Sequence, residues 1–143
     1  LRDTARLVVE RVDPEHRHDR EVVWQSRSGS PQVPWLEPDV GDRIQALAAT
    51  GVDAVAVSPI GFPVENFEVV WDLDVEASGR AADAGVAFTR AEAVDDDPRF
   101  VSMVVDLLVE RLGHDPEPAQ SGLGSLGAPV GACSKACCPG PRP

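Results

Sequence analysis

Five carboxylates lie within one helix-like segment of this chain, and their types and spacing are suited to chemistry. The segment PIGFPVENFEVVWDLDVEASGR, residues 59–80, contains Glu65, Glu68, Asp72, Asp74 and Glu76. At about 100° per residue on a helix, all of these except Asp74 fall within roughly 80° of one another. This group of four, the acidic ridge, has the ligands to bind a divalent cation or to accept protons.

The acidic ridge has two interpretations, a functional site and a solvated helix face. Like charges four residues apart destabilise a helix by about 0.2–0.5 kcal/mol per pair, and no Lys or Arg follows in the segment until Arg80. The ridge also begins just after the apolar run 52–60, at the end of a strand where open α/β sheets place their ligands. Glu65 and Glu68 lie near the helix N-terminus, where the helix dipole favours anions. These features favour function, and the solvated face remains the alternative.

Helices and strands alternate along the segments that must position the ridge. The sequence predicts helices over 2–12, 39–50, 65–84 and, after an Asp cap and a Pro in the first turn, from about 97 to 113. It predicts strands over 21–27, 52–60 and 86–91, with 52–60 buried on both faces. This order is typical of an α/β fold with a parallel sheet. Three strands are few for an open sheet, so we expect a larger protein or a pairing with another chain.

The overall charge excludes several classes of partner. The formal net charge is −11, which argues against a nucleic-acid groove and against binding to an anionic membrane surface. No apolar run of 18 residues is present, so we expect no stable membrane insertion. The first residues do not resemble an export signal, and we therefore expect a cytoplasmic location. A cationic ligand fits the charge better, although acidity often serves only solubility.

The C-terminal part changes in composition and divides the chain into three regions. Residues 1–113 form the predicted domain, 114–132 a linker rich in Pro, Gly and Ser, and 133–143 a tail with Cys133, Cys137 and Cys138. An odd, clustered set of cysteines is a poor disulfide framework and favours thiolate ligands for a metal or cluster. His16 and His18 lie in the charged connection 13–20, where a solvated loop is favoured over a metal site.

Three segments resemble the C-terminal half of ferrochelatases. They are WQSRSGSPQVPWLEPDV (24–40), VSPIGFPVENFEVVWDLDVEA (57–77) and DDPRFVSMVVDLL (96–108), in the family's order and at suitable spacing. With Cys137-Cys138-Pro139, the likeness is greatest to the coproporphyrin III ferrochelatases of high-GC Gram-positive bacteria. The resemblance implies that 1–113 is a C-terminal chelatase domain whose N-terminal half is absent. The implied fold is a three-layer parallel sheet, one Rossmann-like half of the chelatase fold.

The resemblance also implies an activity. Ferrochelatases insert Fe²⁺ into a porphyrin, here coproporphyrin III or, as the second choice, protoporphyrin IX, in haem biosynthesis. Glu68 matches the catalytic glutamate that faces the porphyrin and is the candidate metal ligand, while Asp72 and Glu76 match acids that relay protons or hydrated metal. The opposing histidine belongs to the absent half, so this piece alone is expected to be inactive. The residues expected to fix a loop beside the site are Gln25, Ser26 and Arg27. Those expected to form the wall of the site or the core are Trp35, Pro59 and Phe62.

Some expectations depend on the missing part. Cys133, Cys137 and Cys138 are implied as three of the four thiolates of a possible [2Fe–2S] cluster in the intact protein. Asn66 stands where relatives commonly have histidine, and asparagine does not titrate near neutral pH. Two rival interpretations stay open: a non-catalytic porphyrin- or iron-binding fragment, and a cobalt or nickel chelatase of related fold.

Overall fold

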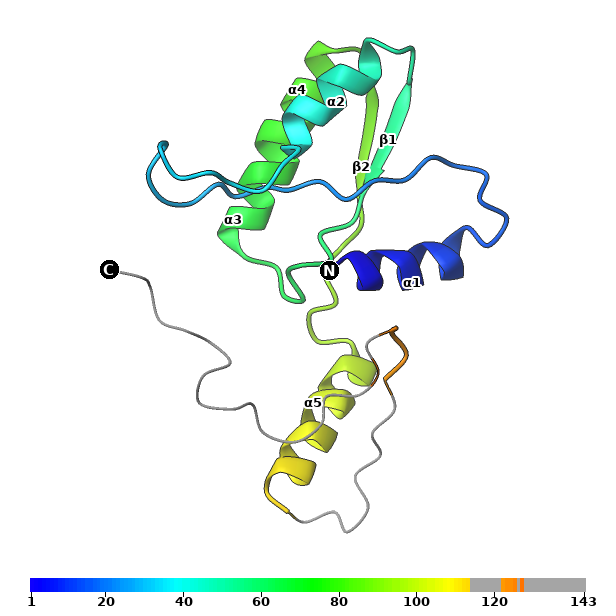
Figure 1. Cartoon of the computed structure of the whole chain (residues 1–143), viewed down its shortest axis with the longest axis vertical. Helices are drawn as coiled ribbons and strands as arrows, with labels where there is room; N and C mark the ends of the chain where they lie inside the picture. Colours follow the sequence, from blue (N-terminus) through cyan, green and yellow to red (C-terminus); the bar gives the residue numbers. More distant parts are fainter. Residues whose placement is uncertain (114–121, 126, 128–143) are drawn as a thin grey trace.

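The computed structural model describes residues 1–113, 122–125 and 127. The cysteine tail 133–143 and most of the predicted linker lie outside these residues. Figure 1 shows the elements in chain order, which are α1 (Arg2–Val12), α2 (Val40–Ala48), β1 (Ala54–Val57), α3 (Phe67–Val69), η1 (Val70–Ala77), α4 (Ser78–Asp83), β2 (Ala87–Arg90) and α5 (Pro98–Arg111). The predicted alternation of helices and strands from residue 40 onward is confirmed.

The sheet of the described residues contains two strands, β1 and β2, which pair in parallel from Ala54 opposite Ala87 to Val57 opposite Arg90. The third strand, predicted over 21–27, is wrong. This segment is extended, but only Trp24 forms a bridge, and its partner is Asp39 rather than a strand of the sheet. A β-like composition therefore marks this segment as extended without giving it a neighbouring strand.

Helices cover one face of this sheet. Val55, Val57 and Phe88 pack against the buried core, whereas the alternate residues Ala54 and Ala56 are exposed. Successive strand residues point to opposite faces, so the second face is open in the described residues. The prediction that the run 52–60 is buried on both faces is therefore wrong for this part of the protein.

The core lies between the sheet, α2 and the helix formed by α3, η1 and α4. Asp39 starts α2, because its carboxylate accepts hydrogen bonds from the backbone N–H groups of Gly41 and Asp42. The residues buried between these elements are all apolar: Val40, Ile44, Val69, Leu73, Ala77, Ala81 and Val86. This core fixes the helix formed by α3, η1 and α4 beside α2.

The helix predicted over 65–84 is confirmed in its extent but not in its winding. The three segments α3, η1 and α4 are continuous from Phe67 to Asp83, and η1 is a π-helix. A π-helix closes i→i+5 hydrogen bonds, so it holds more residues per turn than an α-helix. The buried residues Val69, Leu73, Ala77 and Ala81 follow one another at spacings of four on the core side of this helix.

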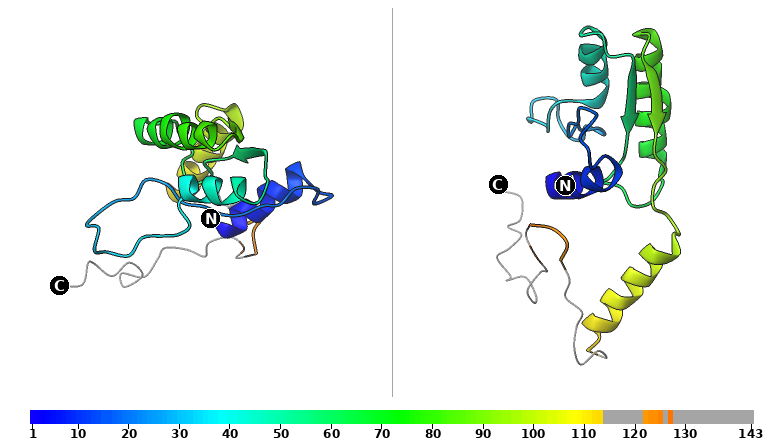
Figure 2. Two further views of the ribbon diagram at one scale, coloured as in Figure 1. Left: turned by 90° about the horizontal axis from the view of Figure 1, so that it is seen from above. Right: turned by 90° about the vertical axis from the view of Figure 1, so that its right-hand side faces the viewer.

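The two terminal helices expose much apolar surface. Neither α1 nor α5 has a buried residue, and Figures 1 and 2 show α5 extending away from the sheet and its helices. Exposed apolar side chains on α5 include Val101, Met103, Val104, Leu107 and Leu108. Of the helices in the described part of the chain, none is long and apolar enough to cross a bilayer.

Candidate active site

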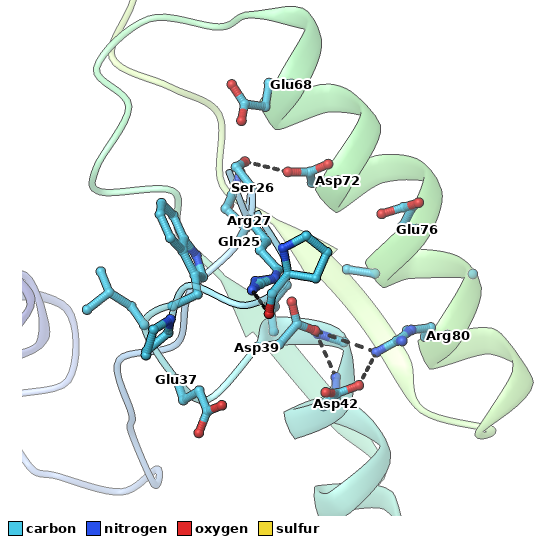
Figure 3. A pocket seen from close by; sticks show the side chains of 18 of the residues that line it. Gln25, Ser26, Arg27, Glu37, Asp39, Asp42, Glu68, Asp72, Glu76 and Arg80 are labelled. Carbon is cyan, nitrogen blue, oxygen red and sulfur yellow. Dashed lines mark hydrogen bonds and ion pairs between the residues drawn. The ribbon is translucent and has the colours of Figure 1, made fainter. Parts of the chain in front are cut away.

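A cavity of about 1130 Å³ lies between the segment 25–42 and one face of the α3–η1–α4 helix. Its volume lies slightly above the range of about 300–1,000 Å³ that is usual for small-molecule sites. Figure 3 shows that the segment 25–42 forms one wall and the helix forms the other. The cavity is thus large enough for a small-molecule ligand.

Glu68, Asp72 and Glu76 line this cavity from the helix side. In Figure 3 they follow one another down the helix on the side that faces the segment 25–42. Their spacing of four residues, about one helical turn, accounts for this alignment. These three residues, the carboxylate row, are the part of the predicted acidic ridge that the structure brings together.

Glu65 does not belong to the row, and this part of the sequence prediction is wrong. The helix begins at Phe67, so Glu65 precedes it. The Glu65 carboxylate instead accepts hydrogen bonds from the Arg90 guanidinium, at 2.6 Å and 3.3 Å, and from the backbone N–H of Ala93 at 3.2 Å. A helical wheel could not place Glu65 correctly, because the wheel assumes that the helix already includes it.

Arg90 also binds Asp74, on the side of the helix away from the row. Its Nε and Nη2 atoms donate to the two Asp74 oxygens at 2.6 Å and 2.8 Å. The hydrogen bond from Arg90 lowers the pKa of Asp74, and those from Arg90 to Asp74 and then Glu65 raise the pKa of the guanidinium. The Arg90 side chain is only 13% exposed. These three residues, the Arg90 clamp, tie the end of β2 to the segment just before the helix, through Glu65, and to the middle of the helix, through Asp74.

The carboxylate row differs from the clamp in its partners. Among the described residues, no Arg, Lys or His forms an ion pair with Glu68, Asp72 or Glu76. The Ser26 hydroxyl donates a hydrogen bond to Asp72 across the cavity. Ser26 holds a φ of 59°, in the left-handed region that non-glycine residues rarely adopt. With this backbone conformation, the Ser26 hydroxyl, which is a neutral donor rather than a cation, lies against the carboxylate row.

The segment that faces the row is organised by Arg27. Its Nη2 atom lies within hydrogen-bonding distance of the carbonyl oxygens of Ser30, Pro31 and Val33, at 3.4 Å, 3.1 Å and 2.9 Å. Gln25 donates to the Ser26 hydroxyl at 3.4 Å. These contacts agree with the loop-fixing roles predicted for Gln25, Ser26 and Arg27.

The three residues predicted as wall or core divide between the two. Trp35 lines the cavity and is partly exposed there. Pro59 is buried, and Phe62 is half-buried against the core, so both support the turn before the helix.

Asn66 has a structural role at the start of the helix. Its side-chain oxygen accepts a hydrogen bond from the backbone N–H of Val69 at 3.0 Å, which makes it the N-cap of α3. Asparagine is among the best residues for this position. Asn66 therefore serves the helix on which Glu68 lies.

Sequence reasoning missed the outer end of the cavity. Arg80 lines it four residues after Glu76, and its Nη1 atom donates to Asp42 at 2.6 Å. The same atom lies 3.5 Å from Asp39, the N-cap of α2. The spacing of four from Glu76 was visible in the sequence, but the partners on α2 were not.

His16 and His18 do not line this cavity. The His18 imidazole lies 3.3 Å from the buried carboxylate of Asp13, and the His16 imidazole lies 2.6 Å from the Arg20 guanidinium. Both serve the turn after α1. The predicted cluster ligands Cys133, Cys137 and Cys138 lie outside the described residues.

Comparison with known proteins shows which family the chain is similar to. A family model described as ferrochelatase matches residues 1–112. The chain is 53% identical over 124 residues to the coproporphyrin III ferrochelatase of Mycolicibacterium smegmatis, covering 80% of this chain and 35% of that protein. It is 45% identical over 145 aligned positions to the protein of the same name from Streptomyces griseus, covering 99% of this chain and 39% of that protein. The chain thus spans well under half the length of these relatives.

Proposed function

Because the chain belongs to the ferrochelatase family, we propose that it is the part of an iron-inserting enzyme that carries the carboxylate row, with coproporphyrin III as the porphyrin. The observation that carries the proposal is the row itself: three carboxylates without an ion-pair partner among the described residues, aligned along a cavity of about 1130 Å³. This arrangement suits a site that handles a cation and protons rather than one that only stabilises the fold.

The reaction defines what the row must do. Fe²⁺ replaces the two pyrrole N–H protons of the porphyrin, so each turnover brings in one divalent cation and releases two protons. Carboxylate oxygens suit both tasks, because they bind a hydrated divalent cation and also accept protons. Soft thiolates would bind the metal more tightly and release it less readily, and no thiol lines the described cavity.

Glu68 is proposed as the catalytic residue and metal ligand. It lies at the first turn of the helix, near the N-terminal end of the row, and its carboxylate faces the cavity. The Asn66 cap and the Arg90 clamp fix the start of this helix, and so they fix the place from which Glu68 reaches the porphyrin. The proton acceptor is thereby positioned before the substrate binds.

Asp72 and Glu76 are proposed to pass protons or hydrated Fe²⁺ between Glu68 and solvent. Asp72 accepts a hydrogen bond from Ser26, a neutral donor that leaves its negative charge in place. Glu76 is exposed and has no ion-pair partner in the described part of the chain. A row of this kind exchanges cations and protons in short steps, because each carboxylate lies one turn from the next.

The rest of the protein is proposed to complete the site. The open face of the sheet and the apolar faces of α1 and α5 supply surface on which a further half can pack. That half would add strands and helices to give the three-layer Rossmann-like fold, and would bring the residue that opposes Glu68. The likeness of the chain to little more than a third of each relative supports this.

The cysteine tail supports a further, separate proposal. Three thiolates, from Cys133, Cys137 and Cys138, fit three of the four positions of a [2Fe–2S] cluster, and a fourth would come from elsewhere in the intact protein. The measurement is visible absorption with iron and sulfide content after anaerobic purification. A colourless protein without inorganic sulfide would contradict the proposal.

The proposed function is tested by metal insertion in the full-length protein. We expect Fe²⁺ to enter coproporphyrin III faster than protoporphyrin IX, and faster than Co²⁺ or Ni²⁺ enters the same porphyrin, as followed by the absorption of the product. Preference for Co²⁺ or Ni²⁺ would favour a different chelatase. Tight porphyrin binding without insertion of any metal would favour a binding protein instead.

A further inference from the structure

The cavity that contains the carboxylate row is strongly acidic. Seven Asp and Glu residues line it, whereas the basic residues that line it in the described part of the chain are Arg27 and Arg80. Coproporphyrin III, the porphyrin of the proposed function, carries four propionate groups, which are ionised near neutral pH. Like charges repel one another more strongly where protein replaces water. A porphyrin with this many carboxylates is therefore held better if one of them meets a cation on the wall that faces the row.

The two arginines of the cavity differ in their partners. The Nη1 atom of Arg80 donates to Asp42 at 2.6 Å and lies 3.5 Å from Asp39. The charge of Arg80 is therefore compensated by carboxylates of the protein. Among the described residues, no carboxylate forms an ion pair with Arg27, whose hydrogen bonds go to backbone carbonyl groups instead.

These carbonyl groups hold the Arg27 side chain without neutralising it. Its Nη2 atom lies 3.4 Å, 3.1 Å and 2.9 Å from the carbonyl oxygens of Ser30, Pro31 and Val33. All three contacts use one guanidinium nitrogen, and Nη1 forms no hydrogen bond with another described residue. The carbonyl oxygens are uncharged, so the guanidinium keeps its full positive charge. Arg27 is thus a fixed cation with N–H groups left to donate to an anion.

Arg27 also lies on the appropriate wall of the cavity. It follows Ser26, whose hydroxyl donates to Asp72, and Figure 3 shows both residues on the segment 25–42, across from the helix that carries the row. A neutral donor therefore meets the row, and the cation beside it meets no carboxylate of the described chain.

We propose that Arg27 binds a propionate carboxylate of the porphyrin. The proposal rests on the proposed function and adds how the substrate is held within the cavity. A propionate bound to the segment 25–42 is kept apart from Glu68, Asp72 and Glu76 on the opposite wall. The negative groups of the substrate and the carboxylates that handle Fe²⁺ then occupy different sides of one site.

Arg27 has a second role, because its contacts with Ser30, Pro31 and Val33 organise the loop. The two roles predict different results for a variant. Disturbing the loop weakens the binding of any porphyrin that fills the cavity. Removing a contact with a propionate weakens the binding only of porphyrins that carry this carboxylate, as in a double-mutant cycle.

The test is porphyrin binding to the full-length protein, measured by fluorescence titration in one detergent-containing buffer. The two probes are coproporphyrin III and its tetraamide, in which each propionate is an uncharged amide. We expect Arg27→Met to weaken coproporphyrin III binding by about tenfold, the usual size of a lost charge-assisted hydrogen bond, and tetraamide binding by less than about twofold. In steady-state iron insertion, KM for coproporphyrin III should rise by a similar factor with little change in kcat.

The matched control is Arg99→Met, which changes the net charge equally. Arg99 pairs with Asp97 at the start of α5 and does not line the cavity, so this variant should alter binding of either probe by less than about twofold.

Two results would overturn the proposal: an Arg27→Met variant that binds both porphyrins equally more weakly, and one that binds coproporphyrin III as well as the unaltered protein does. The titration needs no turnover. If the unaltered protein binds coproporphyrin III through Arg27 but inserts no metal, only the proposed function fails. If the unaltered protein binds neither probe, both proposals fail.

Discussion

The two sides of one helix treat their carboxylates in opposite ways. Asp74, with Glu65 just before the helix, binds Arg90, whose guanidinium reaches both carboxylates at 2.6 Å. Glu68, Asp72 and Glu76, on the cavity side, have no ion-pair partner among the described residues. The residues are chemically alike, and only their neighbours differ.

This difference separates structure from function within a single acidic segment. A carboxylate held by a largely buried arginine has its oxygens occupied and its charge compensated by that partner. A carboxylate that faces a cavity beside a neutral hydroxyl stays available to protons and metals. The repulsion among the row's charges is a cost to the helix.

The largest expected effect comes from Glu68→Gln on the cavity side. We expect the full-length enzyme to lose at least about 100-fold in turnover, because the amide neither accepts the pyrrole proton nor binds iron as a carboxylate does. The thermal midpoint should change little, since Glu68 forms no ion pair with any residue in the described part of the chain. Glu92→Gln, at an exposed position outside the cavity, is the control. Near-normal iron insertion by the Glu68 variant would contradict a functional role for the carboxylates on the cavity side of the helix.

On the side of the Arg90 clamp, Arg90→Met should reduce the stability of the fold. It leaves Glu65 and Asp74 without their partner, and we expect a loss of about 1–3 kcal/mol in the free energy of unfolding. Urea titration of the full-length protein measures this. Arg99→Met, whose side chain is 91% exposed, should have almost no effect. If both variants unfold at the same urea concentration, the clamp does not stabilise the fold.

A smaller effect is expected at the helix start, which both sides share. Asn66→Ala removes the acceptor for the Val69 N–H, and we expect a loss of about 1 kcal/mol. Asn66→Asp retains a capping oxygen and should lose less. The thermal midpoints of the two variants provide the comparison, and an alanine variant as stable as the aspartate variant would contradict the capping role.

The smallest effect concerns pH. The Arg90 hydrogen bond lowers the pKa of Asp74 below its usual 3.8, so the folded state holds this carboxylate ionised where the unfolded chain begins to bind a proton. Its stabilising contribution is therefore complete above pH 3.8 and is lost as the pH falls through the lowered pKa. Asp74→Asn should flatten the acid limb of the stability profile. The free energy of unfolding is measured by urea titration from about pH 2 to about pH 4. If its dependence on pH is the same in the Asp74→Asn variant, this prediction is contradicted.

Local features of the fold were predictable from the sequence. The starts of α2 and α5 follow from Asp39 and from Asp97 before Pro98, whose carboxylates cap their helices in the structure. Periodicity also located α1 and β2 closely. The spacing of Glu68, Asp72 and Glu76 predicted that these three share a face, because that information is contained within one helix.

Long-range pairings and non-standard winding were not predictable in the same way. Arg90 lies 16 and 25 residues from the two carboxylates that it binds, and only the parallel sheet brings it to them. The segment 21–27 has the composition of a strand but finds no neighbouring strand in the described residues. The π-helical winding of Val70–Ala77 has no distinct signal in the sequence either, because residues four apart also share a face in an α-helix.

The backbone bridge between Trp24 and Asp39 has a consequence for the loop that it closes. The Trp24 N–H donates to the Pro38 carbonyl at 2.9 Å, and the Val40 N–H donates to the Trp24 carbonyl at 2.8 Å. Both ends of the intervening loop are thus fastened by main-chain atoms that do not depend on the side chains within it. We therefore expect changes of sequence within residues 28–37 to reshape the wall of the cavity while the carboxylates opposite stay in place.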